Sequence, residues 1–216
     1  MNSRHISFGL VSVAFFAISA NAAAQQVFSQ AQLSTILGGG EIMEDFEGNG
    51  GLPAGQIIDS LLNSTSTYAG FGPGLCKPGA TYTSPSLFWN DNGYFGLNTR
   101  TLGDSSGWRG DDITITYTTP VTAFGFDLAG YQGFGQAGFV KVFDLSNTLI
   151  TSSAINGGFF GWENAGGIGK VVVSATSDYI MIDNHGYGAS TVPEPASLSI
   201  LGLGALGMLV RRRNRR

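Results

Sequence analysis

The sequence predicts an all-β domain of two packed sheets, flanked by an N-terminal signal helix and a C-terminal hydrophobic helix. Seven short segments have the composition of strands, and several of them alternate apolar and polar side chains, which is the period of a half-buried strand. Glycine supplies 33 of the 216 residues, and Gly, Pro, Asn and Asp separate the segments. Aromatic residues make up 12% of the chain, whereas disordered acidic chains have few. This length favours one domain with a sizeable core.

The first 24 residues are predicted to be a secretory signal peptide. Arg4 and His5 give a weakly basic start, and a largely apolar run follows over residues 6–18. Signal peptidase accepts a small-x-small pattern, which is present as Ala-Asn-Ala ending at Ala22 and as Ala-Ala-Ala ending at Ala24. A retained anchor is the alternative, but the run is short for a membrane span. We expect cleavage by signal peptidase and folding outside the cytoplasm.

Residues 25–188 are predicted to form the β-sandwich domain. A short helix is expected over 27–37, with Ser29 as its N-cap and an apolar face of Leu33, Ile36 and Leu37. Strands are expected at residues 42–46, 113–117, 123–128, 139–143, 149–153, 170–175 and 179–183.

Alternation within these strands predicts which side chains face the core. The residues expected to share a face are Ile113, Ile115 and Tyr117; Phe124, Phe126 and Leu128; and Val140 and Val142, with Asp144 as a further candidate, opposite Lys141 and Phe143. Residues 49–110 are rich in Gly, Ser, Asn and aromatics and are expected to be a long irregular region. Long loops in compact domains are usually functional or loosely ordered. If the protein binds a ligand, we expect residues 49–110 to form part of the binding surface.

The charge of the chain is divided between its middle and its end. Residues 25–192 contain five basic and 14 acidic residues, a formal net charge of −9. Nucleic-acid binding needs clustered Lys and Arg against phosphates, so this middle argues against a nucleic-acid partner.

Catalytic residues are poorly represented in the predicted mature chain. Cys76 is the single cysteine, so it is a free thiol or an intermolecular partner, and we favour an unimportant loop thiol. His185 is the single histidine left after signal cleavage and is expected at a strand end. Zinc sites need more such ligands, and no nucleophile elbow is present. We predict that the protein is not an enzyme.

Three tryptophans are candidate contacts for a glycan. Trp89, Trp108 and Trp162 sit among glycines and polar residues. Exposed aromatic faces stack on sugar rings, and clustered exposed aromatics mark binding sites. The alternative is that most of them pack in the core or fasten loops.

Residues 189–216 form a tail with three parts. Pro193 and Pro195 fix φ and hold Glu194 in extended geometry, which a processing enzyme can grip. Residues 196–210 are uncharged and are the predicted membrane helix, although ~22 Å of helix falls short of a ~30 Å hydrocarbon core. The terminal arginines can snorkel, and they fix the orientation with the domain outside.

This order of Pro-Glu-Pro, apolar helix and terminal arginines resembles the PEP-CTERM sorting signal of Gram-negative bacteria. The resemblance implies processing by an exosortase, a membrane-embedded transpeptidase-like enzyme that recognises Pro193-Glu194-Pro195. It also implies transient anchoring in the inner membrane, removal of the tail, and delivery to the cell surface or the exopolysaccharide matrix. A plain C-terminal anchor is the alternative.

Residues 41–188 more loosely resemble the jelly-roll domains that such proteins often carry, through segments such as TPVTAFGFDLAG, VKVFDLSNTLI and DYIMIDNHGYG. Those domains are similar to carbohydrate-binding modules. The resemblance implies a non-catalytic surface or matrix protein that contacts exopolysaccharide. A glycan-active hydrolase on the same scaffold and a purely structural adhesin remain the alternatives.

The jelly-roll resemblance also places two acidic segments together. Terminal strands pair in that fold, so EDFEG and IDNHG are expected to lie side by side. The candidate oxygen ligands for a structural Ca²⁺ are Glu44, Asp45, Glu47, Asp183 and Asn184. Solvated acids at strand ends are the alternative.

Overall fold

The computed structural model describes residues 24–47, 56–57, 60–67, 72–90, 99–104, 111–130, 137–176 and 180–190. Residues 1–23 of the predicted signal peptide, Trp108 and the tail from residue 191 lie outside these ranges. Within the described ranges no helix is long and apolar enough to cross a membrane, and the predicted span 196–210 lies outside them.

Twelve strands and one helix make up the described part of the chain. In order they are β1 (Gln25–Val27), α1 (Gln30–Leu37), β2 (Ile42–Glu44), β3 (Gln56–Ile57), β4 (Leu61–Leu62), β5 (Ala80–Thr83), β6 (Leu87–Asn90), β7 (Thr101–Asp104), β8 (Ile113–Gly130), β9 (Ala137–Phe143), β10 (Leu149–Asn156), β11 (Gly158–Ala175) and β12 (Ile180–Gly188). All pairs among these strands are antiparallel. The predicted all-β fold is confirmed.

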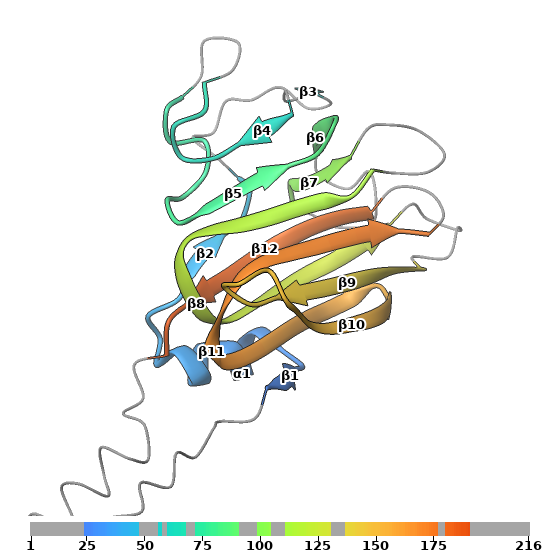
Figure 1. The fold of residues 1–216 in the computed structure, drawn as a ribbon. Coiled ribbons are helices and arrows are strands. Elements are labelled where there is room, and N and C mark those ends of the chain that lie inside the picture. Colours follow the sequence, from blue (N-terminus) through green and yellow to red (C-terminus); the bar gives the residue numbers. More distant parts are fainter. Residues whose placement is uncertain are drawn as a thin grey trace, which may run out of the picture. The chain divides into compact units, whose positions relative to one another are not determined.

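Two layers arise because the long strands β8 and β11 bend and serve both (Figure 1). The first half of β8 pairs with β5 and with the second half of β11, and β4, β9 and β10 complete this layer A. The second half of β8 pairs with the first half of β11 and with β12, and β1, β2, β7, β6 and β3 complete layer B. Strands that switch sheets in this way form the corners of a sandwich.

The main core lies between the inner faces of these layers. Layer A supplies Tyr82, Ile113, Ile115, Tyr117, Val140, Val142, Val171 and Val173, and layer B supplies Trp89, Leu102, Phe124, Phe126, Leu128, Ile182 and Tyr187, all in one buried cluster. The residues predicted to share a face on β8, and Val140 with Val142 on β9, do so, and these faces line the core. Alternation predicts burial correctly here because each of these strands has one face toward solvent and one face toward the core.

The helix α1 covers part of the outer face of layer B. Ser29 caps its first turn through its side-chain oxygen, and Gly38 ends it in the left-handed conformation. Its apolar side packs in a second small cluster formed by Val27, Leu33, Leu37 and Ala123. The helix lies close to β12, since a Cβ added at Gly186 would come within 2.8 Å of Leu33 Cδ2. The predicted helix is confirmed, shortened at its start.

Several predicted boundaries were wrong. Residues 113–117 and 123–128 belong to one strand, because exposed Pro120 lies at the bend of β8 without ending it. The glycine-rich segment before residue 170 is not a loop but the first half and the bend of β11. The region 49–110 contains β3 to β7 and is not one irregular loop.

Candidate functional site

His185 lies at the centre of the core and not at a strand end as predicted. It belongs to β12 of layer B and is fully buried. The Tyr82 hydroxyl lies 2.8 Å from its Nδ1, and the Tyr117 hydroxyl lies 3.0 Å from its Nε2. Both tyrosines come from layer A, so one imidazole connects the two layers through both ring nitrogens. Burial lowers the pKa of His185 to about 3, and the ring is neutral.

A bulge in β12 produces this placement. The pairing of β12 with β8 shifts between Asp183 and Gly186, and Asn184 takes a positive φ of 48°. The extra residue lets Ile182 and His185 both face the core while Asp183 points to the outer face of layer B. Asparagine tolerates this backbone conformation better than most side chains.

Glu44 and Cys76 form a second buried polar region. Glu44 Oε1 accepts a hydrogen bond from the Phe46 amide at 2.9 Å, and Oε2 accepts one from the Lys77 amide at 2.5 Å. Burial raises the pKa of Glu44. Burial, reinforced by Glu44, also raises the pKa of the Cys76 thiol. Cys76 is a buried free thiol, and at neutral pH it is not a thiolate nucleophile.

The two acidic segments do lie side by side, as the register pairs Glu44 of β2 with His185 of β12. Their side chains divide into two groups, because Glu44 turns toward Lys77 whereas Asp183 joins Asp127 on β8. Asp45 accepts a hydrogen bond from the Glu47 amide at 3.3 Å. The five predicted calcium ligands therefore do not converge on one point.

Asp183, Asp127 and Glu47 form what we call the acidic cluster. Asn184 Nδ2 donates to Asp127 Oδ2 at 3.0 Å, and the Asn184 amide donates to Asp183 Oδ1 at 2.7 Å. Thr99 Oγ1 also donates to Asp183. Burial, with smaller contributions from Asp127 and Glu47, raises the pKa of Asp183. Within the described ranges no group of three or more His, Cys, Asp or Glu side chains is placed to hold a metal ion.

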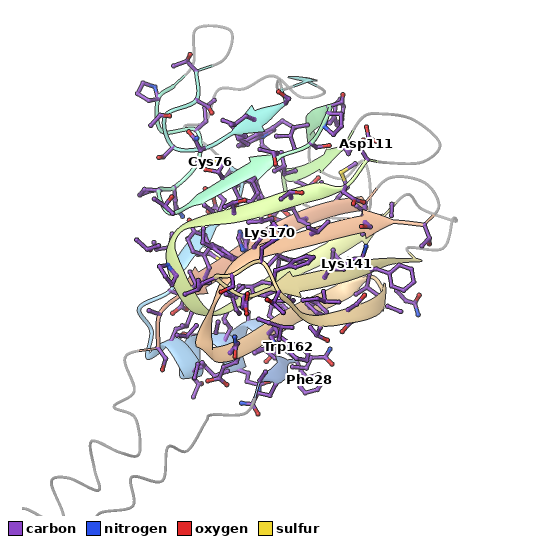
Figure 2. The ribbon with its side chains drawn as sticks, viewed as in Figure 1. Phe28, Cys76, Asp111, Lys141, Trp162 and Lys170 are labelled. Carbon is purple, nitrogen blue, oxygen red and sulfur yellow. The ribbon has the colours of Figure 1, made fainter. Side chains whose placement is uncertain are left out.

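The predicted tryptophan contacts need correction. Trp89 on β6 is fully buried and packs edge-on against Phe46, so its face is not available to a sugar. Trp162 on β11 is half-buried and packs against the core, with its indole nitrogen enclosed (Figure 2). Trp108 lies outside the described residues. The glycine and polar neighbours of these tryptophans suggested exposure, but neighbours in sequence do not determine which face of a strand a residue lies on.

The outer face of layer A carries a set of side chains that the sequence analysis did not single out. Two rows cross it in register: Lys141, Val172, Thr114 and Thr83, then Phe143, Lys170, Thr116 and Thr81. We call this surface, together with neighbouring Phe139, the lysine–threonine face. Figure 2 labels Lys141 on β9 and Lys170 on β11, which are adjacent strands.

Alternation explains why these residues face outward. Val140 and Val142 occupy the core, so Phe139, Lys141 and Phe143 between and beside them must face solvent. Phe139 is 42% exposed. The Lys170 ammonium lies 4.2 Å from the centroid of the Phe143 ring, a cation–π contact across the strands. The same alternation in the sequence could have identified this face.

An open hollow of about 430 Å³ adjoins the β5 end of the lysine–threonine face. Thr83 and Thr114 belong to both, and Leu61, Pro85 and Asp112 complete most of the remaining wall. Leu61 is directly opposite Thr83 in the register and is 46% exposed. The hollow therefore extends the flat face with a concave end that has apolar and hydroxyl groups.

Comparison with known proteins identifies the tail. Residues 191–216 match the family model described as the PEP-CTERM protein-sorting motif, which confirms the resemblance predicted for this segment. The match includes Pro193, Glu194 and Pro195. No curated protein and no solved structure gave a significant match to the chain.

Proposed function

We propose that this exported chain, sorted through exosortase by its PEP-CTERM motif, is a non-catalytic cell-surface or matrix protein that binds exopolysaccharide. The sorting motif at residues 191–216 is the observation that carries the proposal. Such a motif indicates export and a membrane-associated tail before surface localisation. The β-sandwich is then the part that works outside the cell.

The lysine–threonine face is the surface we assign to glycan contact. Phe139 offers an exposed apolar ring to the CH groups of a sugar, and the threonine hydroxyls donate and accept hydrogen bonds. The surface is flat because it is the face of a sheet, which suits an extended polymer more than a small molecule. This assignment replaces the tryptophans as the proposed contacts.

The proposal gives no catalytic role to His185 or Cys76. Both nitrogens of His185 are engaged by tyrosine hydroxyls, and the ring is shielded from solvent. The raised pKa of Cys76 leaves it as a thiol. A general base and a nucleophile must reach the substrate, which neither side chain does from the core.

The first test is the fate of the chain in its native cells. Intact mass and cell fractionation are compared for the wild type, a Pro193→Ala/Pro195→Ala variant, and Pro85→Ala, an exposed proline far from the motif in sequence. We expect the wild type and Pro85→Ala to lose the tail and reach the surface, while the double variant keeps the tail and stays in the inner membrane. A tail retained by all three chains would reduce Pro-Glu-Pro to a linker and contradict the proposed sorting.

A second candidate, a glycan-active hydrolase, is favoured by one observation. Burial raises the pKa of Asp183, which lies beside Asp127 and Glu47, and glycoside cleavage uses two neighbouring carboxyl groups, one of which has a raised pKa. Release of reducing ends from matrix polysaccharide by the wild type, lost in Asp183→Asn, would favour this candidate. Neither binding nor cleavage, together with self-association, would favour a structural adhesin.

A further inference from the structure

We infer that the lysine–threonine face takes an acidic polysaccharide, one whose sugars carry carboxylate groups, with Lys141 and Lys170 as the residues that bind the carboxylates. The inference rests on the proposed glycan-binding function and specifies its ligand class. It depends on the two lysines, on the distribution of the acids, and on the hydroxyl and aromatic groups between them.

Both lysines are unpaired cations in an acidic domain. Two other cations of the described residues are occupied, because Lys77 Nζ donates to the Met43 carbonyl and Arg100 Nη1 donates to the Glu47 carbonyl. Lys170 lies over the Phe143 ring, and among the described residues neither Lys170 nor Lys141 has a carboxylate within ion-pair distance. Their ammonium groups are therefore free to take an anion from outside the chain.

The acidic cluster does not lie on the lysine–threonine face. Asp127 and Asp183 alternate with core residues of layer B, so the acidic cluster belongs to the outer side of layer B and the lysines to that of layer A. Asp112 is an exposed acid that immediately precedes β8 and borders the hollow beside Thr114. In register, Lys170 is opposite Thr116, which is roughly 13 Å along β8 from Asp112, and Lys141 lies two strands from β8, roughly 10 Å. Both separations are at least about one Debye length at physiological salt.

The neutral groups of the face fit a sugar polymer. In register, Lys141 is followed across the sheet by Val172, Thr114 and Thr83, and Phe143 by Lys170, Thr116 and Thr81. A chain lying along the first row passes from Lys141 to Thr83 over three strand spacings, roughly 14 Å, and one lying along the second row passes from Lys170 to Thr81 over two, roughly 10 Å. The hollow beside Thr83 then accepts the next unit, where Asp112 can accept hydrogen bonds from sugar hydroxyls.

The charge of the domain selects among polyanions. Residues 25–192 have a net charge of −9. This charge repels a polymer with one phosphate on every unit more strongly than two lysines attract it. A polysaccharide with isolated carboxylates suffers less repulsion and still satisfies both cations. Hydroxyl contacts along the threonine rows then add to the binding of the sugar itself.

The test measures retardation of the full chain, purified in detergent, on native gels that contain deacylated gellan, a polysaccharide with one carboxylate in each tetrasaccharide repeat. Dextran gels are the neutral comparison. The variants are Lys141→Gln/Lys170→Gln and each single change. Lys77→Gln is the control with the same change of charge outside the face. We expect the double variant to lose about tenfold in affinity for gellan, each single variant about threefold, and Lys77→Gln less than about twofold. Binding of the wild type should weaken between about 50 and about 300 mM salt, because the Debye length shortens from roughly 14 Å to roughly 6 Å.

Four outcomes would overturn the inference, and they separate it from the proposed function. Equal binding of gellan and dextran, unaffected by the lysine variants, leaves a glycan-binding protein without acidic selectivity. If the chain binds neither polymer, the proposed glycan-binding function is wrong as well. The sorting test does not depend on either glycan result. Tighter binding to duplex DNA or to phosphatidylglycerol vesicles, lost in the double variant, assigns the face to a phosphate ligand. Loss of binding in Lys77→Gln equal to that of the double variant indicates a net-charge effect and no site.

Discussion

Acidification is expected to weaken the sandwich through His185, the imidazole between the layers. In the folded chain both ring nitrogens are bonded to the hydroxyls of Tyr82 and Tyr117, and burial lowers the pKa to about 3. In the unfolded chain the pKa returns to the model-peptide value of 6.5. Above pH 6.5 the ring is neutral in both states, so its contribution to stability is fully present.

Below pH 6.5 the unfolded chain binds a proton that the folded chain does not. The free energy of unfolding then falls by about 1.4 kcal/mol per pH unit, and the loss continues until pH approaches 3. Between pH 8 and pH 5 the expected loss is about 2 kcal/mol. Glu44 and Asp183 act in the opposite direction, because their raised pKa values favour the folded state as the pH falls. The effect of His185 must therefore be isolated by a variant.

The assay is urea unfolding of the full chain in detergent, followed by tryptophan fluorescence at pH 8, 7, 6 and 5. His185→Gln keeps a donor and an acceptor but does not titrate, so the stability difference between wild type and this variant should shrink by about 2 kcal/mol from pH 8 to pH 5. Tyr82→Phe retains the imidazole and is the matched control. Its difference in unfolding free energy from the wild type should not change with pH. A constant difference for His185→Gln across this range would refute a buried neutral ring.

Three further predictions concern the acidic cluster, the buried thiol and the glycines of layer B. Asp183→Asn should raise stability at pH 7, because a carboxylate with a raised pKa costs folding free energy once it ionises, and the gain should vanish below pH ~4. Loss of stability in this variant, together with calcium stabilisation of the wild type alone, would instead support a calcium site. Cys76 should react with a disulfide reagent only when the chain unfolds, and rapid labelling in native buffer would contradict its burial. Gly161→Ala should cost ~1–3 kcal/mol by thermal unfolding, since the new Cβ would lie 2.8 Å from the Phe124 carbonyl oxygen. Gly166→Ala, where a new Cβ meets nothing closer than 3.6 Å, is its control and should be nearly neutral.

The sequence predicted those parts of the fold that depend on local periodicity. The alternation of Ile113, Ile115 and Tyr117 identified their buried face, and the Ser29 cap identified the helix, because both signals lie within a few residues. Strand continuity was not predictable in this way. Pro120 interrupts the pattern but lies at a bend, where its missing N–H has little cost, so β8 continues through it.

The candidate site was harder to predict because it depends on pairing between distant strands. His185 was placed at a strand end because the bulge at Asn184 shifts the alternation by one residue, and only the structure shows that shift. The lysine–threonine face needs the register of four strands to bring Lys141 and Thr83 into one row. Trp89 was misplaced for the same reason, since its burial follows from β6 lying over the core.

The position of β12 determines how the domain resists a pull on its C-terminal side. β12 is bonded to β8 along one edge and to β2 and β7 along the other, so tension along the strand strains many hydrogen bonds at once in shear. Beyond the strand, the Ser190 amide donates to Thr122 Oγ1 at 2.5 Å, and its hydroxyl donates to the Ile36 carbonyl at 3.1 Å. These two hydrogen bonds of Ser190 would bear load before β12 does, because they connect the chain after β12 to β8 and α1. A pull on this end of the domain therefore loads many sheet hydrogen bonds together, so the sandwich does not open by peeling off one strand.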